Sequence, residues 1–135
     1  MIGAISEMLD SNVLIYAFST DPRSDAAERL LQRRCIVSIQ ALNEFANVSR
    51  RKMGMSWDEI GCATEAIRQL CSAVLPLDVE AHSNAIRIAE RYQLSFFDAL
   101  MISSGLAHGC EVLWSEDMRD GLVIDRKLHI RNPFE

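Results

Sequence analysis

Short apolar segments alternate with stretches of helical periodicity along the chain, and this alternation constrains the fold more than any other feature. The first apolar segment ends near Asp10, and the later ones cover Cys35–Val37, Val74–Leu77 and Cys110–Trp114, before two short segments at Leu122–Asp125 and Leu128–Arg131. Strands that alternate with helices form a mainly parallel sheet with helices on both faces. Ligands of such sheets bind beyond the carboxyl ends of the strands, so the residues following each strand are the first candidates for a site.

Polar residues that can cap a helix mark where the expected helices begin. Asp21-Pro22 predicts one start, because aspartate caps helices and proline fits the first turn. Ser56-Trp57-Asp58-Glu59 has the Ser-x-x-Glu pattern of a capping box. The other expected caps are Ser38, Asp78 and Ser95. Each of these residues precedes apolar residues at helical spacing, which places the helices between the strands.

The length of 135 residues predicts one domain, spanning residues 1–135. The longest apolar run, Val13–Phe18, is much shorter than the ~20 residues of a membrane-spanning helix, so we expect no membrane association. The four cysteines form no C-x-x-C pair and are expected to be reduced core residues. Reduced cysteines are typical of the cytoplasm, which is the expected location.

The formal net charge of -5 argues against a polyanionic partner, unless several of the 19 acidic residues surround a cation. Basic residues cluster locally at Arg50, Arg51 and Lys52. Such a cluster is either a solvated surface or a patch that binds phosphate groups, and the sequence leaves both interpretations open.

Four carboxylates from distant parts of the chain are expected at one edge of the sheet. Asp10 lies at the end of the first strand, and Asp117 lies just past the fourth. Glu44 lies in the second turn of the helix that leaves the second strand. Asp98 lies in the first turn of the helix that leads back into the fourth strand. Taken singly, each acid could be a cap, a turn residue or part of a solvated helix face.

Two of these acids have strongly apolar neighbours. Asp10 interrupts an apolar segment, and Asp98 lies between Phe96-Phe97 and Ala99-Leu100-Met101-Ile102. A buried carboxylate needs a partner, yet neither segment offers an arginine or lysine at a matching place. Carboxylates that converge without bases indicate a hard divalent cation, Mg²⁺ or Mn²⁺.

Hydrolysis of a phosphodiester bond is the reaction that suits such a site, because a cation neutralises the phosphate and activates water. The chain contains no G-x-S-x-G, Walker-type or G-x-G-x-x-G motif. A phosphatase that uses Asp10 as its nucleophile would carry a second aspartate two positions later, where this chain has Asn12.

Four segments resemble, in order and spacing, the motifs of PIN-domain ribonucleases. They are Leu9-Asp10-Ser11-Asn12-Val13-Leu14, Ser38-Ile39-Gln40-Ala41-Leu42-Asn43-Glu44-Phe45, Leu94-Ser95-Phe96-Phe97-Asp98-Ala99-Leu100 and Trp114-Ser115-Glu116-Asp117-Met118. The closing Ile130-Arg131-Asn132-Pro133-Phe134 resembles the VapC-type toxin branch of that family. The resemblance implies a three-layer α/β/α PIN-like fold with a central, mainly parallel sheet of four or five strands.

The resemblance also assigns roles to the matching residues. Asp10, Asp98 and Asp117 would support the principal Mg²⁺ or Mn²⁺ ion, and Glu44 would serve a second ion or the activation of water. Ser11 and Asn12 match turn residues that shape the site. Glu116 stands beside Asp117 and could compete with it for the metal, although the family spacing favours Asp117.

The resemblance further implies a metal-dependent endoribonuclease that cuts RNA, often tRNA, as the toxin of a type II toxin–antitoxin pair. Its partners would be RNA, an antitoxin protein and a second copy of itself, with DNA reached only through the antitoxin. An apolar helical stripe, Ile60, Ile67, Leu70 and Val74, is a further reason to expect a homodimer. The alternative is a non-catalytic PIN-like module that binds RNA or protein, which the presence of all four acids disfavours.

Overall fold

The computed structural model describes residues 5–135, so the start of the expected domain at residue 1 lies outside it. Its strands and helices follow one another in the alternation that the sequence predicts. Their bounds are β1 Glu7–Leu9, α1 Ser11–Ala17, α2 Ser24–Leu31, β2 Ile36–Ser38, α3 Ile39–Arg51, α4 Trp57–Leu70, β3 Ala73–Leu75, α5 Val79–Tyr92, α6 Phe96–His108, β4 Val112–Trp114, β5 Val123–Ile124 and β6 Leu128–Arg131.

The strands form one sheet in the order β3-β2-β1-β4-β6-β5. All neighbouring strands are parallel except β5 and β6, so the mainly parallel sheet is confirmed. The described residues contribute six strands rather than the expected four or five, because Val123 and Ile124 pair with β6 as a very short edge strand. This antiparallel hairpin adds an edge without changing the parallel centre.

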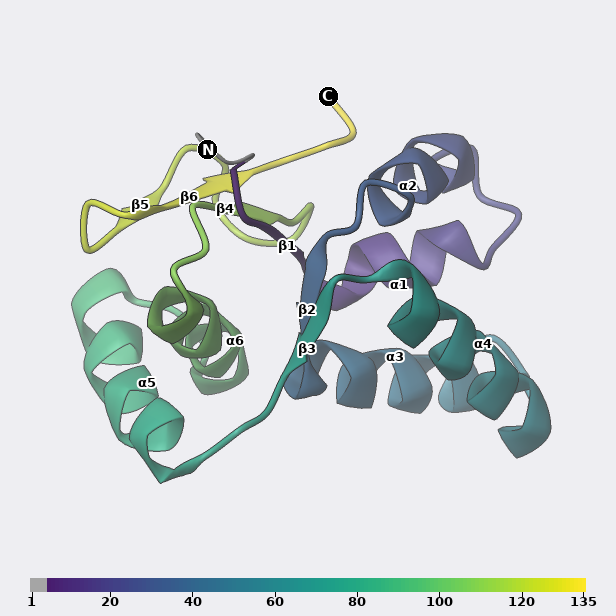
Figure 1. The fold of residues 1–135 in the computed structure, drawn as a ribbon, viewed down its shortest axis with the longest axis horizontal. Helices are drawn as coiled ribbons and strands as arrows, with labels where there is room; N and C mark the ends of the chain where they lie inside the picture. Colours follow the sequence, from purple (N-terminus) through teal and green to yellow (C-terminus); the bar gives the residue numbers. More distant parts are fainter. Residues whose placement is uncertain (1–4) are drawn as a thin grey trace.

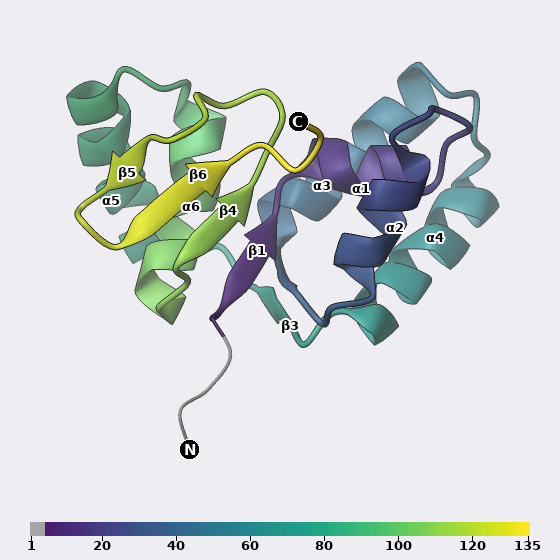
Figure 2. The same ribbon diagram turned by 90° about the horizontal axis from the view of Figure 1, so that it is seen from above.

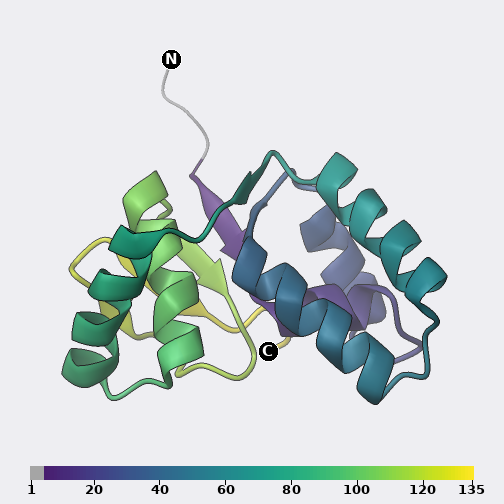
Figure 3. The same ribbon diagram turned by 90° about the horizontal axis from the view of Figure 1, so that it is seen from below.

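The helices lie in two groups, with α1–α4 on one side of the central strands and α5 and α6 on the other (Figure 1). Figure 2 shows β1, β4 and β6 side by side, and Figure 3 shows the same two groups of helices from below. The core between them is apolar, and its largest fully buried side chains include Phe45, Met8, Leu14, Met101 and Ile130. In the described part of the chain, none of the helices has the length and apolar character needed to cross a membrane.

The helix caps follow the sequence prediction at four of five positions. Ser38, Ser56, Asp78 and Ser95 each accept a hydrogen bond from a backbone N–H in the first turn. The prediction at Asp21-Pro22 is wrong, since α2 begins at Ser24. The Asp21 carboxylate accepts bonds from the backbone and the guanidinium of Arg23, at 2.8 Å each, and is therefore unavailable as a cap.

The cysteines are free in the structure. Cys35, Cys71 and Cys110 are buried as expected, whereas Cys62 is exposed on α4. The expectation of a core position is therefore wrong for Cys62, which lies on the outer side of its helix.

Gly105 allows α6 to approach β1 closely. A methyl group at this position would stand only 2.3 Å from the sulfur atom of Met8, which is fully buried in β1. Asp98 precedes Gly105 by seven residues, or two helical turns, so both lie on the same face of α6. The missing side chain at Gly105 therefore helps to place Asp98 near the end of β1.

We predict that Gly105→Ala lowers the free energy of unfolding by about 1–3 kcal/mol, because the added methyl overpacks a filled core. Gly61→Ala is the matched control, since Gly61 lies inside α4 with open space where its methyl would stand. That change should stabilise the protein by up to about 1 kcal/mol through helix propensity. Urea unfolding of both variants checks the pair, and equal stability of the two would contradict this account of Gly105.

Candidate functional site

The parallel pairing of β1 with β4 brings Asp10 beside Ser115. Leu9 pairs with Trp114, and the Asp10 amide donates to the Trp114 carbonyl at 3.0 Å. The next residues of the two strands, Asp10 and Ser115, therefore emerge together at the carboxyl edge of the sheet. There the Ser115 hydroxyl donates to Oδ2 of Asp10 at 2.7 Å.

The carboxylate of Asp10 is almost completely buried, with an exposure of 3%. It caps α1 by accepting from the Ser11 amide at 2.6 Å, and it accepts from the Asn12 side chain at 3.2 Å. Burial raises the pKa of Asp10 to about 7, although the bonds from Ser115 and Ser11 oppose the shift. The negative charges of Glu44 and Asp98 raise this pKa further.

Glu44 reaches the same edge from the second turn of α3. Its Oε1 accepts from the Ser11 hydroxyl at 2.8 Å, and its Oε2 accepts from the Gln40 side chain at 3.1 Å. Ser11 therefore links Glu44 to Asp10, because the Ser11 amide bonds to Asp10 while its hydroxyl bonds to Glu44. The two carboxylates are neighbours held by neutral groups and not by a base.

Asp98 lies half-buried in the first turn of α6. Its backbone N–H donates to the Ser95 hydroxyl at 3.2 Å, but its carboxylate does not complete a capping box. Burial raises the pKa of Asp98, and the charges of Glu44 and Asp117 add to the shift. The Ser95 side chain bonds to this carboxylate and acts to lower its pKa, but none of the ion pairs within residues 5–135 involves Asp98.

Asp117 lies exposed in the loop after β4. Its Oδ2 accepts from the Asn12 side chain at 3.4 Å, and the same amide group donates to Asp10. Asn12 therefore bridges the carboxylates of the first and fourth motifs, while Ser11 bridges those of the first and second.

Glu116 bonds outside this group, to a side chain of α1 and to one of the segment that joins α1 to α2. Its carboxylate accepts from the Tyr16 hydroxyl at 2.6 Å and from the Arg23 guanidinium at 2.7 Å. The bond from Tyr16 lowers the pKa of Glu116, and Arg23 contributes in the same direction. Of the two adjacent acids, Asp117 is the one that shares a donor with Asp10.

The sequence reasoning did not identify Ser115, Gln40, Tyr16 or Arg23 as parts of this region. Ser115 stands inside the fourth motif and Gln40 stands one helical turn before Glu44. These positions are the signals that could have revealed them as hydrogen-bond partners. Nothing comparable in the sequence links Arg23 to Glu116.

The three residues of the basic cluster, Arg50, Arg51 and Lys52, have different positions at the end of α3. Arg51 follows Glu44 by seven residues and lies on the same face, about 10 Å along the axis. Arg50 donates to the Met55 carbonyl at 3.2 Å and lies 5.2 Å from the centre of the Trp57 ring. Lys52 caps the end of α3. Arg51 is therefore the basic residue of this cluster that is aligned with the acidic edge.

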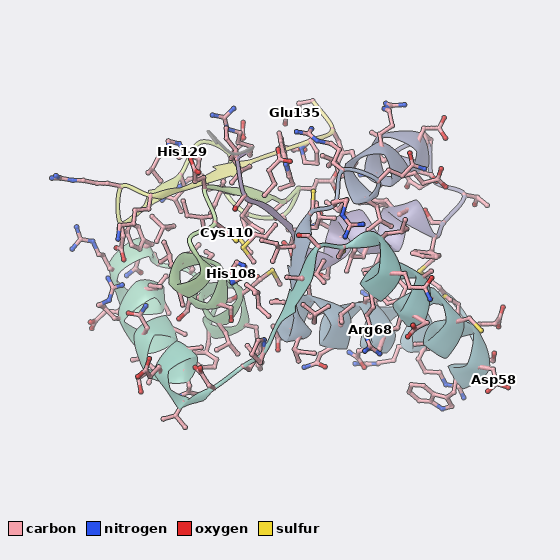
Figure 4. All side chains as sticks on the ribbon, in the orientation of Figure 1. Asp58, Arg68, His108, Cys110, His129 and Glu135 are labelled. Carbon is pink, nitrogen blue, oxygen red and sulfur yellow. The ribbon has the colours of Figure 1, made fainter. Side chains whose placement is uncertain are left out.

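The chemistry of this edge fits a hard divalent cation, because its charged groups are carboxylates with only hydroxyl and amide partners. His108 and Cys110 lie at the opposite end of α6, beside the start of β4 (Figure 4). However, no three His, Cys, Asp or Glu side chains within residues 5–135 stand close enough together to hold one ion. The donors surround the edge without converging on one point.

Residues 8–120 match the family model for the PIN domain, which spans all four acidic motifs. The chain belongs to the PIN-domain family. No curated protein sequence matches this PIN domain.

Solved structures share its fold at low sequence identity. The VapC20 toxin of Mycobacterium tuberculosis, described as cleaving the sarcin–ricin loop, has 20% identity and a TM-score of 0.69, covering 83% of this chain and 90% of its own. A toxin–antitoxin complex from Klebsiella pneumoniae has 17% identity and a TM-score of 0.72, covering 96% and 99%. A DNA-bound VapBC complex from Salmonella typhimurium has 17% identity and a TM-score of 0.69, with the same coverage.

We predict that Asp98→Asn raises the melting temperature in buffer containing a chelator, by about 2–5 °C at pH 8. The raised pKa of Asp98 means that the folded state binds a proton more tightly than the unfolded state. Its contribution to stability is therefore greatest at low pH and is lost as the pH rises through the folded-state pKa. The gain from Asp98→Asn should shrink toward zero near pH 4, as melting curves across this range would show. A gain independent of pH would contradict the electrostatic cause.

Proposed function

We propose that this PIN-domain protein is an endoribonuclease that depends on Mg²⁺ or Mn²⁺ and hydrolyses phosphodiester bonds in RNA. The observation that carries the proposal is the arrival of four carboxylates, from four separate motifs, at one edge of the sheet without a basic partner. Asp10 and Asp98 support it most strongly, because burial makes each charge costly and the fold retains both. The cap of α1 and the bond from Ser115 offset only part of that cost for Asp10, whose pKa stays raised.

Each residue has a defined task in this proposal. Asp10, Asp98 and Asp117 would hold the principal ion, and Glu44 would serve a second ion or orient the attacking water. A bound divalent cation neutralises phosphate charge and makes water a better nucleophile. Ser11, Asn12 and Ser115 keep the carboxylate oxygens oriented through the hydrogen bonds described above. Asp98 and Asp117 have the fewest bonds, so their side chains have the greatest freedom to turn toward an ion.

Arg51 is the candidate contact for the RNA strand beyond the acidic edge. It lies on the face of α3 that carries Glu44, two turns away. We propose that it binds a flanking phosphate, with Lys52 nearby, while Arg50 chiefly supports the loop after α3. Binding that depends on such contacts weakens as the salt concentration rises.

The proposed biological role is that of a VapC-type toxin with a protein antitoxin as its inhibitor. Support comes from the solved structures of the same fold, several of which are toxin–antitoxin complexes. The substrate class would be structured RNA, with tRNA as the first candidate. DNA would be reached only through the antitoxin, as the resemblance to VapC-type toxins implies.

A homodimer is proposed on the family resemblance alone. The apolar stripe on α4 no longer supports it, because Ile60 and Ile67 are 5% and 0% exposed within the single chain. Val74 belongs to β3 and not to the helix, and only Leu70 of the stripe remains exposed. Sedimentation at micromolar concentration is expected to give the dimer mass, and a monomer mass would contradict the proposal.

We predict that Asp98→Asn lowers cleavage of total tRNA more than about 100-fold, which exceeds the loss typical of an outer hydrogen-bond partner. The fold should persist, because asparagine has nearly the same volume and Ser95 still caps α6. Asp58→Asn is the matched control, since Asp58 also lies in the first turn of a helix. That helix is α4, and Figure 4 shows Asp58 at its outer end. It should cleave like the wild type.

A chelator should abolish cleavage by the wild type and by Asp58→Asn, and added Mn²⁺ should restore it. Cleavage that persists in Asp98→Asn or in the chelator would show that the proposed mechanism is wrong. RNA that binds to the wild type but is never cut, with any divalent cation, would favour the non-catalytic binding module.

A further inference from the structure

A compact cluster of three side chains, Tyr16, Arg23 and Glu116, joins the loop that carries Asp117 to α1 and to the segment that follows it. Glu116 accepts from Tyr16 at 2.6 Å and from Arg23 at 2.7 Å. Arg23 also lies over the Tyr16 ring, 4.1 Å from its centre, and forms an ion pair with Asp21 at 2.8 Å. Hydrogen bonds to charged groups at these lengths are the short, directional kind. The cluster therefore fixes the direction of the Glu116 side chain from two sides.

The spacing on α1 explains why this cluster bears on the acidic edge. Asn12 and Tyr16 are four residues apart and lie on the same face of the helix. Asn12 accepts from the Glu116 amide at 3.3 Å and donates to Asp117 at 3.4 Å. One turn further along, Tyr16 holds the Glu116 side chain. A single helical face thus contacts the backbone, the side chain and the neighbour of Glu116.

The loop itself contains the donor that orients Asp10. The Ser115 hydroxyl donates to Asp10 and accepts from the Met118 amide at 3.1 Å. A change in the backbone at Glu116 would therefore move Ser115 on one side and Asp117 on the other.

We propose that Glu116, held by Tyr16 and Arg23, is a positioning residue that keeps Ser115 and Asp117 aligned with Asp10. This inference rests on the proposed function, since it concerns the same site. Glu116 does not touch the metal or the RNA in this arrangement and acts through the loop that carries it.

The solvent exposure of the cluster indicates that it contributes little to the stability of the fold. The side chains of Arg23 and Glu116 are 40% and 23% exposed, and ion pairs at that exposure add little to the free energy of folding. In contrast, the loop that this cluster holds contains Ser115 and contacts Asn12, which are hydrogen-bond partners of the proposed metal ligands. Removal of such partners changes metal affinity by about 10–100-fold. The cluster should therefore matter more for the site than for the fold.

A second cluster of a tyrosine, an arginine and a carboxylate can serve as the control, with the difference that its Tyr92 hydroxyl also accepts from the Asp125 amide at 2.8 Å. Asp125 accepts from the Tyr92 hydroxyl at 3.1 Å and from Arg87 at 2.7 Å. Their ion pair is 47% and 29% exposed, close to the values for Arg23 and Glu116. This second cluster joins α5 to the turn before β6, at the sheet edge opposite the four acids.

The test compares Tyr16→Phe with Tyr92→Phe. Each change removes one hydroxyl that bonds to a carboxylate and keeps the aromatic ring, so the Phe134 contact of Tyr16 also survives. In Tyr16→Phe we expect Mn²⁺ affinity, measured by calorimetry, to fall about tenfold. We expect kcat on RNA to fall with it while KM stays the same. Tyr92→Phe should match the wild type in all three quantities.

Further variants at Glu116 extend the comparison. Glu116→Ala should lose at least as much Mn²⁺ affinity as Tyr16→Phe. Glu116→Gln keeps an oxygen that can accept from Tyr16 and should lose less. Wild-type Mn²⁺ affinity and kcat in Tyr16→Phe would overturn the inference, and so would a change confined to KM, because that would indicate direct contact with RNA.

Amide hydrogen exchange in the metal-free protein separates this inference from the proposed function. The Glu116 and Met118 amides should exchange faster in Tyr16→Phe than in the wild type, and not in Tyr92→Phe, since their acceptors are Asn12 and Ser115. Unchanged exchange would overturn the positioning role. If the wild type neither binds Mn²⁺ nor cuts RNA, the proposed function fails, while the exchange result still decides whether Tyr16 orders the loop.

Discussion

The parallel pairing of Leu9 with Trp114 places the first and fourth acidic motifs side by side at the edge of the sheet. It makes Asp10 and Ser115 emerge side by side, and the bond between them joins the first strand to the loop after the fourth. The Asp10 carboxylate also caps α1, so the same side chain fixes the start of that helix. Ser11 then meets Glu44, Asn12 meets Asp117 and Tyr16 meets Glu116. Moving this register by one residue would separate the contacts to the loop after β4, those of Asp10 with Ser115, Asn12 with Asp117 and Tyr16 with Glu116.

The edge carries an electrostatic cost that the rest of the fold must offset. Asp10 is buried, with a pKa raised to about 7, and the pKa of Asp98 is raised for the same first reason. Neutral donors reduce the cost but do not cancel the charges. Such a concentration of unfavourable charge is common where a protein binds or reacts, because the ligand supplies the missing partner. Apolar packing on both sides of the sheet, including the close contact of Gly105 with Met8, holds the carboxylates together without that partner.

Local patterns in the sequence were sufficient to predict most elements of this fold. Caps such as Ser38 and Ser95 act within one helical turn, so their effect can be inferred from neighbouring residues alone. The helix expected at Asp21-Pro22 began later because Asp21 bonds to Arg23, and Arg23 is in turn held by Glu116 from the other end of the chain. The sequence marked the short segment Leu122–Asp125, but its role as the sixth strand could not be inferred, since β5 forms only through its pairing with β6.

The candidate site likewise combines features that can be predicted locally with contacts between distant parts of the chain. The strand ends and helix starts predicted that four acids would reach one edge, because parallel topology fixes the sides on which they lie. The partners of each acid depend on register and helix phase across long separations, as with Ser115 and Asp10. For this reason the residues alone did not decide between Glu116 and Asp117, and the preference for Asp117 came from the family spacing. Only the fold shows that Tyr16 and Arg23 donate hydrogen bonds to the Glu116 carboxylate.

The central claim is that the carboxylates of Asp10, Asp98 and Asp117 share one divalent ion. The most direct measurement is anomalous diffraction from crystals of the protein soaked in Mn²⁺. The account predicts one strong peak at the carboxyl edge of the sheet, about 2.0–2.3 Å from an oxygen of each of the three side chains. The absence of a peak at that edge, with the ion bound elsewhere or not at all, would contradict it.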